Sequence, residues 1–434
     1  MRLSLLATLV AQAVFVTAQI PPRQDPWYAA PAGFESRAPG TVLKIRPAPG
    51  DLSSEAGANS TYNVLYRTTD SQYRPAWAVT TVFVPKTPVN ALLSYQIPYD
   101  SADVDASPSY ALYQSVQDDI KNALAKGQFV TVPDYEGPLA SFTAGVISGH
   151  ATIDAVRATL SLRGISTLTF NSNTRYALWG YSGGALASEW AAELQADYAP
   201  EMRFAGAALG GLTPNITAVL LAINKGYAVG LAPNAILGLT SQFPEIQEYV
   251  ISRLKPTGLI YNRSNFLRAW NNTLAESIVD FLFQDISKYF VGGFDDLLGH
   301  QPTLAVINSN GIMGQHGAPR FPLFVYKAIK DNISPVEDTD ELVAQFCAQG
   351  ADIEYIRNTR GGHTAEGDNG RPNAVAFLDA VLAGTYVTGR GCSIRDVTQG
   401  TNISPLKNRQ TEEDFEQGEF DPEEFARRLL PGWH

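Results

Sequence analysis

The 434-residue sequence has few charged residues, which make up 17 % of it, whereas apolar residues make up 45 %. With 36 glycines and 27 prolines, this composition excludes a disordered chain or a coiled coil and indicates a globular protein with many loops. No internal repeat is evident. The length suits one large domain with an inserted subdomain, or two ordinary domains.

Long apolar runs are absent after the N-terminus, so no later segment is expected to span a membrane. Residues 1–18 have the pattern of a secretory signal: Arg2, an apolar stretch at 3–16 and a small-residue cleavage site at 16–18. The mature chain is therefore predicted to begin near Gln19 and to be secreted. The alternative is an N-terminal membrane anchor, although the run is shorter than the ~20 residues that cross a bilayer.

The sequence also lacks an excess of basic residues. Its formal net charge is −11, and loss of Arg2 with the signal removes one positive charge and gives −12. Such a surface repels nucleic acid and gains nothing from anionic membranes, so neither is expected as a partner.

Cysteine is almost absent. Cys347 and Cys392 are the only two, and in an oxidising export pathway an even pair predicts one disulfide worth ~3 kcal/mol. Two unpaired buried thiols are the alternative. No metal site is expected. Sequons that fit a glycosylating route begin at Asn59, Asn215, Asn262 and Asn271.

The spacing of apolar residues predicts a mixed sheet. Runs at 62–67 and 77–85, joined by a polar turn, predict two antiparallel strands. Farther along, strand-like and helix-like segments alternate, which predicts a mostly parallel sheet flanked by helices. In this part we expect strands at 91–95, 128–132, 176–179, 204–209, 322–328 and 353–357, and helices at 153–162, 185–195 and 374–382.

The same spacing predicts five parts in the chain. After the signal at 1–18, residues 19–212 form the first part of the core. Residues 213–316 show helical periodicity, glycine breaks and no clear strand, which predicts an inserted helical cap or lid. Residues 317–405 complete the core. The acidic segment 406–434 is expected to be a solvated tail, or else a regulatory flap.

A serine stands where a predicted strand turns into a predicted helix. Gly180, Tyr181, Ser182, Gly183 and Gly184 match the nucleophile elbow of α/β-hydrolases, in which small residues give clearance to a strained turn. The predicted fold class is therefore α/β, an α/β-hydrolase with a mostly parallel central sheet. Ser182 is the predicted nucleophile.

Histidine is scarce, so few residues can serve as the base that a serine nucleophile needs. In this fold the base follows both the serine and the acid in the chain, on the loop after the last strand. His363 has that place directly after the strand at 353–357. His316 and His434 are weaker candidates, and a surface-loop histidine is the alternative interpretation of His363.

The acid of a triad is expected just past the preceding strand, where Asp331 lies. Asp338 and Asp340 are rivals that lie farther from the strand end, in the predicted start of a helix. The order of Ser182, Asp331 and His363 along the chain is the one that the α/β-hydrolase arrangement requires.

A tetrahedral oxyanion needs two hydrogen-bond donors. The backbone amide of Gly183 is the first candidate. The second should come from the loop after the strand at 91–95, which lacks the glycine-rich motif common in esterases. Asp100 is the candidate there, through its backbone amide or a protonated side chain. A plain turn aspartate is the alternative.

Six short motifs in order along the chain resemble the fungal secretory lipase family, of the lipase A type within the α/β-hydrolase superfamily. They are Tyr66-Arg67-Thr68-Thr69, Ser94-Tyr95-Gln96, Asp134-Tyr135-Glu136-Gly137, Gly180-Tyr181-Ser182-Gly183-Gly184, Tyr198-Ala199-Pro200-Glu201 and Cys347-Ala348-Gln349-Gly350-Ala351. The resemblance covers most of the mature chain. It implies a hydrolase core, a helical lid, a Ser-Asp-His triad, an aspartate in the oxyanion hole at Asp100 and the disulfide between Cys347 and Cys392.

These observations predict a secreted, monomeric serine hydrolase that cleaves carboxylic esters, foremost a triacylglycerol lipase at a lipid–water interface, without a cofactor. The alternatives are an acyltransferase or peptidase on the same fold, or a non-catalytic binding module. Apolar cap residues are expected to form an acyl tunnel, foremost Leu220, Leu221, Ile223, Leu231, Ile236 and Leu237.

Overall fold

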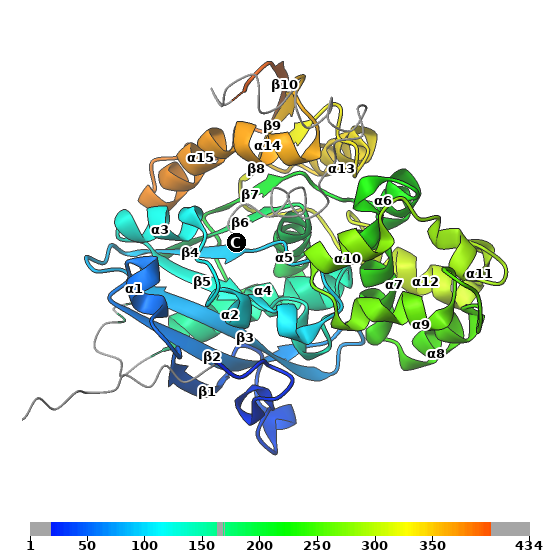
Figure 1. Ribbon diagram of the computed structural model, residues 1–434. Helices are drawn as coiled ribbons and strands as arrows, with labels where there is room; N and C mark the ends of the chain where they lie inside the picture. Colours follow the sequence, from blue (N-terminus) through cyan, green and yellow to red (C-terminus); the bar gives the residue numbers. More distant parts are fainter. Residues whose placement is uncertain (1–18, 163–167, 169, 401–434) are drawn as a thin grey trace, which may run out of the picture.

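The computed structural model describes residues 19–162, 168 and 170–400 (Figure 1). The predicted signal at 1–18 and the predicted acidic tail at 406–434 lie outside these residues.

Strands of the described chain form one ten-stranded sheet in the order β1-β2-β3-β5-β4-β6-β7-β8-β9-β10. They are β1 (Val42–Pro47), β2 (Ser60–Thr69), β3 (Pro75–Val84), β4 (Ala91–Gln96), β5 (Phe129–Pro133), β6 (Arg175–Tyr181), β7 (Gly206–Gly210), β8 (Leu323–Ala328), β9 (Ile353–Asn358) and β10 (Cys392–Val397). The pairs β1–β2, β2–β3 and β3–β5 are antiparallel. The other pairs, from β5–β4 to β9–β10, are parallel. Each strand that the sequence predicts is present. The two edge strands, β1 and β10, were not predicted.

Helices cover both faces of the sheet. They are α1 (Leu52–Ala56), α2 (Pro108–Ala111), α3 (Asp118–Ala125), α4 (Gly145–Ser161), α5 (Gly183–Tyr198), α6 (Ile216–Ile223), α7 (Leu231–Ser241), α8 (Pro244–Arg253), α9 (Arg263–Phe266), α10 (Leu274–Phe281), α11 (Asp295–Leu298), α12 (Gln301–Gly311), α13 (Val336–Ala348), α14 (His363–Asn369) and α15 (Arg371–Ala383). Among them, α4 and α5 pack on one face, and α3 and α15 pack on the other (Figure 1).

The alternating direction of side chains along each strand explains why the sheet has an apolar core on each face. Successive side chains of a strand point to opposite faces, so Leu178 of β6 joins the core under α4 and α5, whereas its neighbour Trp179 joins the core under α3 and α15. Both faces are buried, as parallel sheets require. Because the parallel strands end at one edge, the loops that follow β4, β6, β8 and β9 lie close together.

The segment between β7 and β8 is helical. It holds α6 to α12, at the right of Figure 1, and has an apolar core of its own that includes Leu237, Phe266 and Phe281. We call this segment, α6 to α12, the helical insertion. It contacts the loops at the carboxyl edge of the sheet: Ser101 donates a hydrogen bond to the carbonyl of Asn272 at 2.7 Å.

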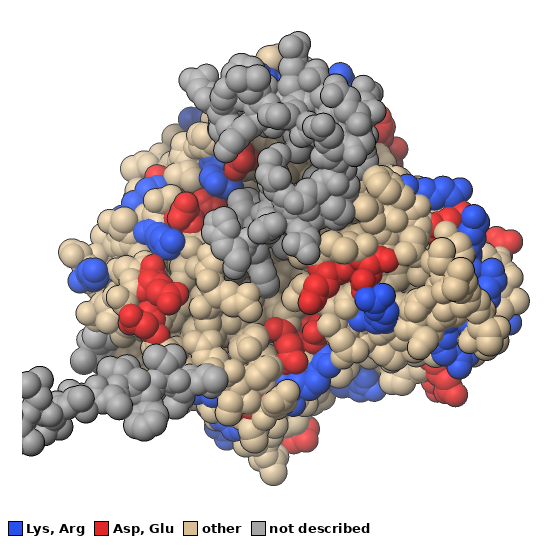
Figure 2. Space-filling view, in the orientation of Figure 1, with Lys and Arg blue, Asp and Glu red and all other residues tan. Residues whose placement is uncertain are grey.

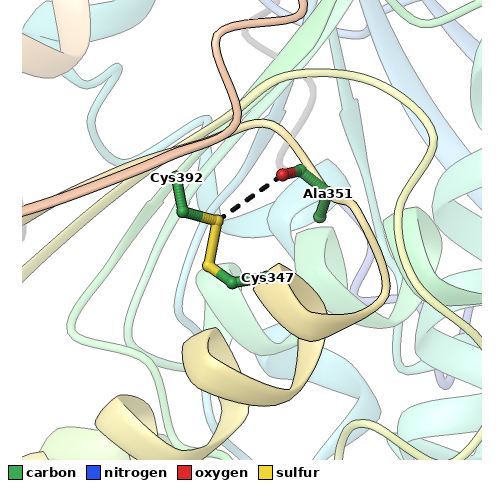
Figure 3. The surroundings of a disulfide bond; sticks show 3 residues. All are labelled: Cys347, Ala351 and Cys392. Atoms are coloured by element: carbon green, nitrogen blue, oxygen red, sulfur yellow. Dashed lines mark hydrogen bonds between the residues drawn. A yellow bond between two sulfur atoms is a disulfide. The ribbon is translucent and has the colours of Figure 1, made fainter.

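A disulfide joins the end of α13 to the start of β10. Cys347 and Cys392 are bonded, with Cα atoms 5.9 Å apart, and Figure 3 shows the bond beside the carbonyl of Ala351. The predicted disulfide is therefore present in the structure.

On the face drawn in Figure 2, Lys and Arg are interspersed with Asp and Glu over both the core and the helical insertion. In the described part of the chain, no helix combines the length and the apolar character needed to cross a bilayer.

Candidate active site

Ser182 occupies a sharp turn between β6 and α5. Its backbone has φ 53° and ψ −122°, a conformation that costs a non-glycine residue about 1–3 kcal/mol. The turn is held on both sides, because the amide of Ser182 donates to the carbonyl of Gly210 at 2.9 Å and its carbonyl accepts from the amide of Leu186 at 2.9 Å. The strained turn leaves the hydroxyl at the tip of the strand.

The glycines around Ser182 are required by close backbone contacts. A Cβ at Gly180 would lie 2.1 Å from the carbonyl oxygen of Gly184, and one at Gly184 would lie 2.0 Å from that of Gln96. Both distances are too short for any side chain, so only glycine lets the strand, the turn and the helix approach this closely. This clearance is what the elbow motif predicts.

Three predicted residues meet at the carboxyl edge of the sheet. Nε2 of His363, at the start of α14, lies 2.9 Å from Oγ of Ser182, and its Nδ1 lies 2.7 Å from Oδ2 of Asp331, in the turn after β8. The hydroxyl of Tyr181 donates to the backbone carbonyl of His363. His363 is 4 % exposed, and the side chain of Asp331 is fully buried. The imidazole is therefore fixed between the hydroxyl and the carboxylate.

The environment of Asp331 keeps its carboxyl ionised. Burial alone would raise the pKa of Asp331, but His363, Lys327 and the amide of Ser334 outweigh burial and hold the pKa well below its usual range. Nζ of Lys327 lies 3.0 Å from Oδ2, and the amides of Ile333 and Ser334 both donate to Oδ1 at 2.9 Å. A carboxylate of this kind can stabilise a positively charged imidazole.

Among the described residues, none of the rivals makes a hydrogen bond to Ser182 or to the ring of His363. Asp340 accepts hydrogen bonds from Tyr355 and Arg357, and Asp338 lies in α13. His316 contacts the buried Glu193 through both its amide and its ring. His434 lies outside the described residues. His363 and Asp331 thus have the positions that a base and its acid require beside Ser182.

Asp100 and Gly183 lie beside Ser182. A Cβ at Gly183 would be 1.8 Å from Oδ1 of Asp100, so this carboxyl stands directly against the residue after the nucleophile. Asp100 is 4 % exposed, and Oδ1 has no hydrogen-bond partner among the described residues. Burial raises the pKa of Asp100 to about 7. Below that pH the protonated carboxyl can donate a hydrogen bond.

Two buried polar residues that the sequence did not predict contact Asp331 and Asp100. Lys327 is fully buried and donates to the carbonyl of Leu212 at 2.6 Å as well as pairing with Asp331. Its signal was a lysine inside an apolar strand, four residues before the acid. Asn234, in α7, donates to the carbonyl of Asp100 at 2.9 Å. No local pattern marks Asn234, because its partner lies 134 positions away.

An apolar cavity opens beside the nucleophile, with a volume of about 80 Å³. Ser182, Gly183 and Asp100 are among the residues that line it, and the helical insertion supplies much of the wall. Of the six apolar residues predicted to form a tunnel, four line this cavity: Leu220, Ile223, Leu231 and Ile236. The other two do not, because Leu221 is 54 % exposed and Leu237 packs in the core of the insertion.

Comparison with known proteins relates the sequence and the fold to lipases and esterases. A sequence model described as secretory lipase matches residues 110–389. The trichothecene C-3 esterase of Fusarium sporotrichioides is 49 % identical over 93 % of each chain, and lipase A of Arthroderma benhamiae is 38 % identical over 86 % of this chain and 82 % of that protein. The crystal structure of Candida antarctica lipase A superposes with a TM-score of 0.79 at 26 % identity, covering 89 % of this chain and 92 % of that one.

Proposed function

This chain belongs to the secretory lipase family and is a carboxylic ester hydrolase, and on that premise we propose that it removes short acyl groups from alcohols through a Ser182 acyl-enzyme. In this proposal His363 is the general base and acid, Asp331 orients and stabilises the imidazole, and Asp100 with the amide of Gly183 forms the oxyanion hole.

The observation that carries the proposal is the pair of contacts of His363. Its two ring nitrogens lie 2.9 Å from Oγ of Ser182 and 2.7 Å from Oδ2 of Asp331, within hydrogen-bond reach of both. A neutral imidazole with its proton on Nδ1 presents a lone pair to the serine hydroxyl, which is the arrangement that activates a serine nucleophile.

The reaction proceeds in two halves. His363 takes the proton of Ser182 as Oγ bonds to the ester carbonyl carbon, and the developing oxyanion faces Asp100 and the amide of Gly183. The bond to the alcohol oxygen then breaks, and His363 returns the proton to that oxygen. In the second half, His363 deprotonates a water that attacks the acyl-enzyme, and it then returns the proton to Oγ of Ser182 as the carboxylic acid leaves.

Substrate size favours a short acyl group. The apolar cavity at Ser182, about 80 Å³, has room for a handful of water-sized groups, which suits an acetyl or similar chain. We also propose a trichothecene ester as the substrate, which the 49 % identity to a trichothecene C-3 esterase supports. A triacylglycerol is the second candidate, supported by the apolar cavity wall and by the relatives named lipase.

Labelling with a fluorophosphonate probe tests the nucleophile. The protein should be labelled, and Ser182→Ala should lose labelling and ester hydrolysis together. Ser148→Ala is the matched control, because Ser148 is a buried helical serine on α4 that donates to its own helix. Labelling of Ser182→Ala at the normal rate would refute the assignment, and no labelling of the intact protein would favour a non-catalytic binding module.

A substrate series tests the class of ester. Rates are compared for a 3-acetylated trichothecene, an emulsified long-chain triacylglycerol and a peptide amide, with and without an added acceptor alcohol. Preference for the acetate supports the proposal, whereas preference for the emulsion favours the lipase. Activity confined to the amide, or transfer of the acyl group in place of hydrolysis, would favour a peptidase or an acyltransferase.

We further propose that the protein is secreted as a glycosylated monomer after removal of residues 1–18, as membership of a family of secretory lipases supports. Of the four predicted glycosylation sites, Asn59 and Asn271 are exposed, whereas Asn215 and Asn262 are half-buried and cap helices α6 and α9. Glycans are therefore expected first at the two exposed sites. N-terminal sequencing, glycopeptide mapping and sizing of the secreted protein test these points.

A further inference from the structure

A second cavity meets the apolar cavity at Ser182. Its volume is about 470 Å³, several times that of the first. Four residues line both cavities: Asp100, Ser182, Leu231 and Ile333. The nucleophile therefore stands at the junction of a small space and a large one. We call them the acyl cavity and the alcohol cavity for the reasons that follow.

The position of His363 indicates which cavity takes the acyl half of an ester and which takes the alcohol half. His363 lines the large cavity and is not part of the small one. The alcohol oxygen must take a proton from His363 as its bond to the acyl carbon breaks, so the alcohol has to lie on the side of His363. The acyl group is then directed into the small cavity.

The walls of the alcohol cavity combine apolar and polar side chains. Ile97, Trp179 and Ile278 contribute apolar surface from the β4 loop, β6 and the helical insertion. With a volume of about 470 Å³, the cavity has room for a bulky ring system, and a rigid ligand of that size loses less entropy on binding than a chain that is free to rotate.

A network of charged and polar groups also lines this cavity. The hydroxyl of Tyr95 donates to Oδ2 of Asp119 at 3.1 Å, and Nε of Arg371 lies 3.6 Å from the same oxygen. Nη2 of Arg371 lies 3.2 Å from Asp368. All four side chains line the cavity. A guanidinium carries five N–H donors, so Arg371 can hold both carboxylates and still donate to a ligand oxygen.

We propose that the large cavity is the binding site for the alcohol half of the substrate, and that it selects rigid, polycyclic alcohols carrying further hydroxyl or ether oxygens, which Arg371 and Tyr95 recognise. This inference rests on the proposed triad, and it adds the site and the chemical class of the alcohol. A diacylglycerol is a poor fit, because its alkyl chains would lie against charged groups and shield them from water.

The first test compares acetates of different alcohols. Ethyl acetate and the monoacetate of a hydroxylated steroid form the same acyl-enzyme, so their kcat/KM values differ only through the alcohol half. We expect the steroid acetate to be preferred at least tenfold in the unmodified protein. Equal values, or preference for ethyl acetate, would overturn the inference and leave the triad intact. Failure to hydrolyse either ester, together with no fluorophosphonate labelling, would instead refute the proposed function.

Gly367→Phe narrows the cavity without straining the backbone. Gly367 lies in α14 and lines the alcohol cavity, and a Cβ there would meet only the ring of Tyr181, at an ordinary 3.5 Å. The ratio of kcat/KM for the steroid acetate to that for ethyl acetate should fall at least tenfold. Val279→Phe is the matched control, since Val279 is an exposed residue of α10 beside the lining Ile278. An unchanged ratio in Gly367→Phe would contradict the assignment.

Arg371→Met tests the polar network. The readout is the ratio of kcat/KM for the hydroxylated steroid acetate to that for the same skeleton without its hydroxyl groups. We expect this ratio to fall several-fold in Arg371→Met and to recover in part in Arg371→Lys, because loss of a polar partner removes selectivity for the polar substrate. A loss of activity that is equal for both substrates would indicate a structural role only and would overturn the proposed recognition.

Discussion

Asp100 combines three unfavourable features, one in its backbone and two in its carboxyl group, that point to catalysis. Its backbone has φ 45°, its carboxyl is buried, and its Oδ1 faces Gly183 without a hydrogen-bond partner in the described part of the chain. Strain and unpaired polar groups of this kind are retained where they serve a reaction. With a pKa raised by burial to about 7, the carboxyl is a hydrogen-bond donor below neutral pH.

The pH profile should therefore depend on Asp100. Below about pH 7 the protonated carboxyl donates to the oxyanion, and above it the ionised form repels the oxyanion. Two pH units above the pKa, about 1 % of the carboxyl is protonated, so kcat/KM of the unmodified protein should fall on the order of a hundredfold by pH 9. Asp100→Asn donates at every pH and should keep its activity there.

Asp100→Ala supplies the control, because it has no side-chain donor and should be slow at all pH values. Parallel profiles for the unmodified protein and Asp100→Asn would show that the backbone amide of Asp100, and not its carboxyl, serves the oxyanion.

At the scale of elements, the helical insertion does more than cover the site. Asn234 of α7 is fully buried, donates to the carbonyl of Asp100 and accepts a hydrogen bond from Ser277 of α10. Two helices of the insertion thus hold the loop that carries Asp100, which we call the oxyanion loop after its proposed role. Movement of the insertion would therefore shift Asp100.

Asn234→Asp should lower kcat about 10- to 100-fold while KM changes little. The substitution keeps the shape of the side chain but removes the donor to Asp100, so the loss falls on transition-state stabilisation rather than on substrate binding. Steady-state kinetics on a short acetate measure this. Asn310→Asp is the matched control, because Asn310 is a buried amide of the insertion that donates to Ser309 and not to the oxyanion loop. A rise in KM with kcat unchanged would show that Asn234 shapes a cavity and does not position Asp100.

At the scale of the whole molecule, the disulfide stabilises the end of the sheet farthest from the antiparallel strands. It ties the edge strand β10, whose side chains are largely exposed, to α13. The strand β10 pairs with β9, and the loop after β9 leads to His363. The bond closes a loop of 45 residues, which limits the conformations of the unfolded chain.

The double variant Cys347→Ala/Cys392→Ala should lose about 3 kcal/mol of stability, with faster thermal inactivation, and should keep its rate of fluorophosphonate labelling at 25 °C. Inactivation half-lives at several temperatures measure the first effect, and labelling measures the second. The hydrogen bonds between Ser182, His363 and Asp331 and the ion pair of Asp331 with Lys327 involve neither cysteine, so a loss of labelling in the folded variant would contradict a purely stabilising role of the disulfide.

The sequence by itself determined the features that neighbouring residues encode. The elbow around Ser182, the inner strands and the order of Ser182, Asp331 and His363 all follow from short patterns, because buried strands are continuously apolar and a strained turn demands small residues. The edge strands β1 and β10 lack that apolar signal, since most of their side chains remain partly or wholly exposed.

Only the tertiary structure decided the contacts between distant parts of the chain. The ion pair of Lys327 with Asp331, the bond from Asn234 to Asp100, and the placing of His363 on one of two cavities arise from packing of the insertion and the loops against the sheet. Residues more than a hundred positions apart leave no periodic mark in the sequence. Their pairing depends on which surfaces fold against one another, and for that reason substrate selection could be inferred only from the folded chain.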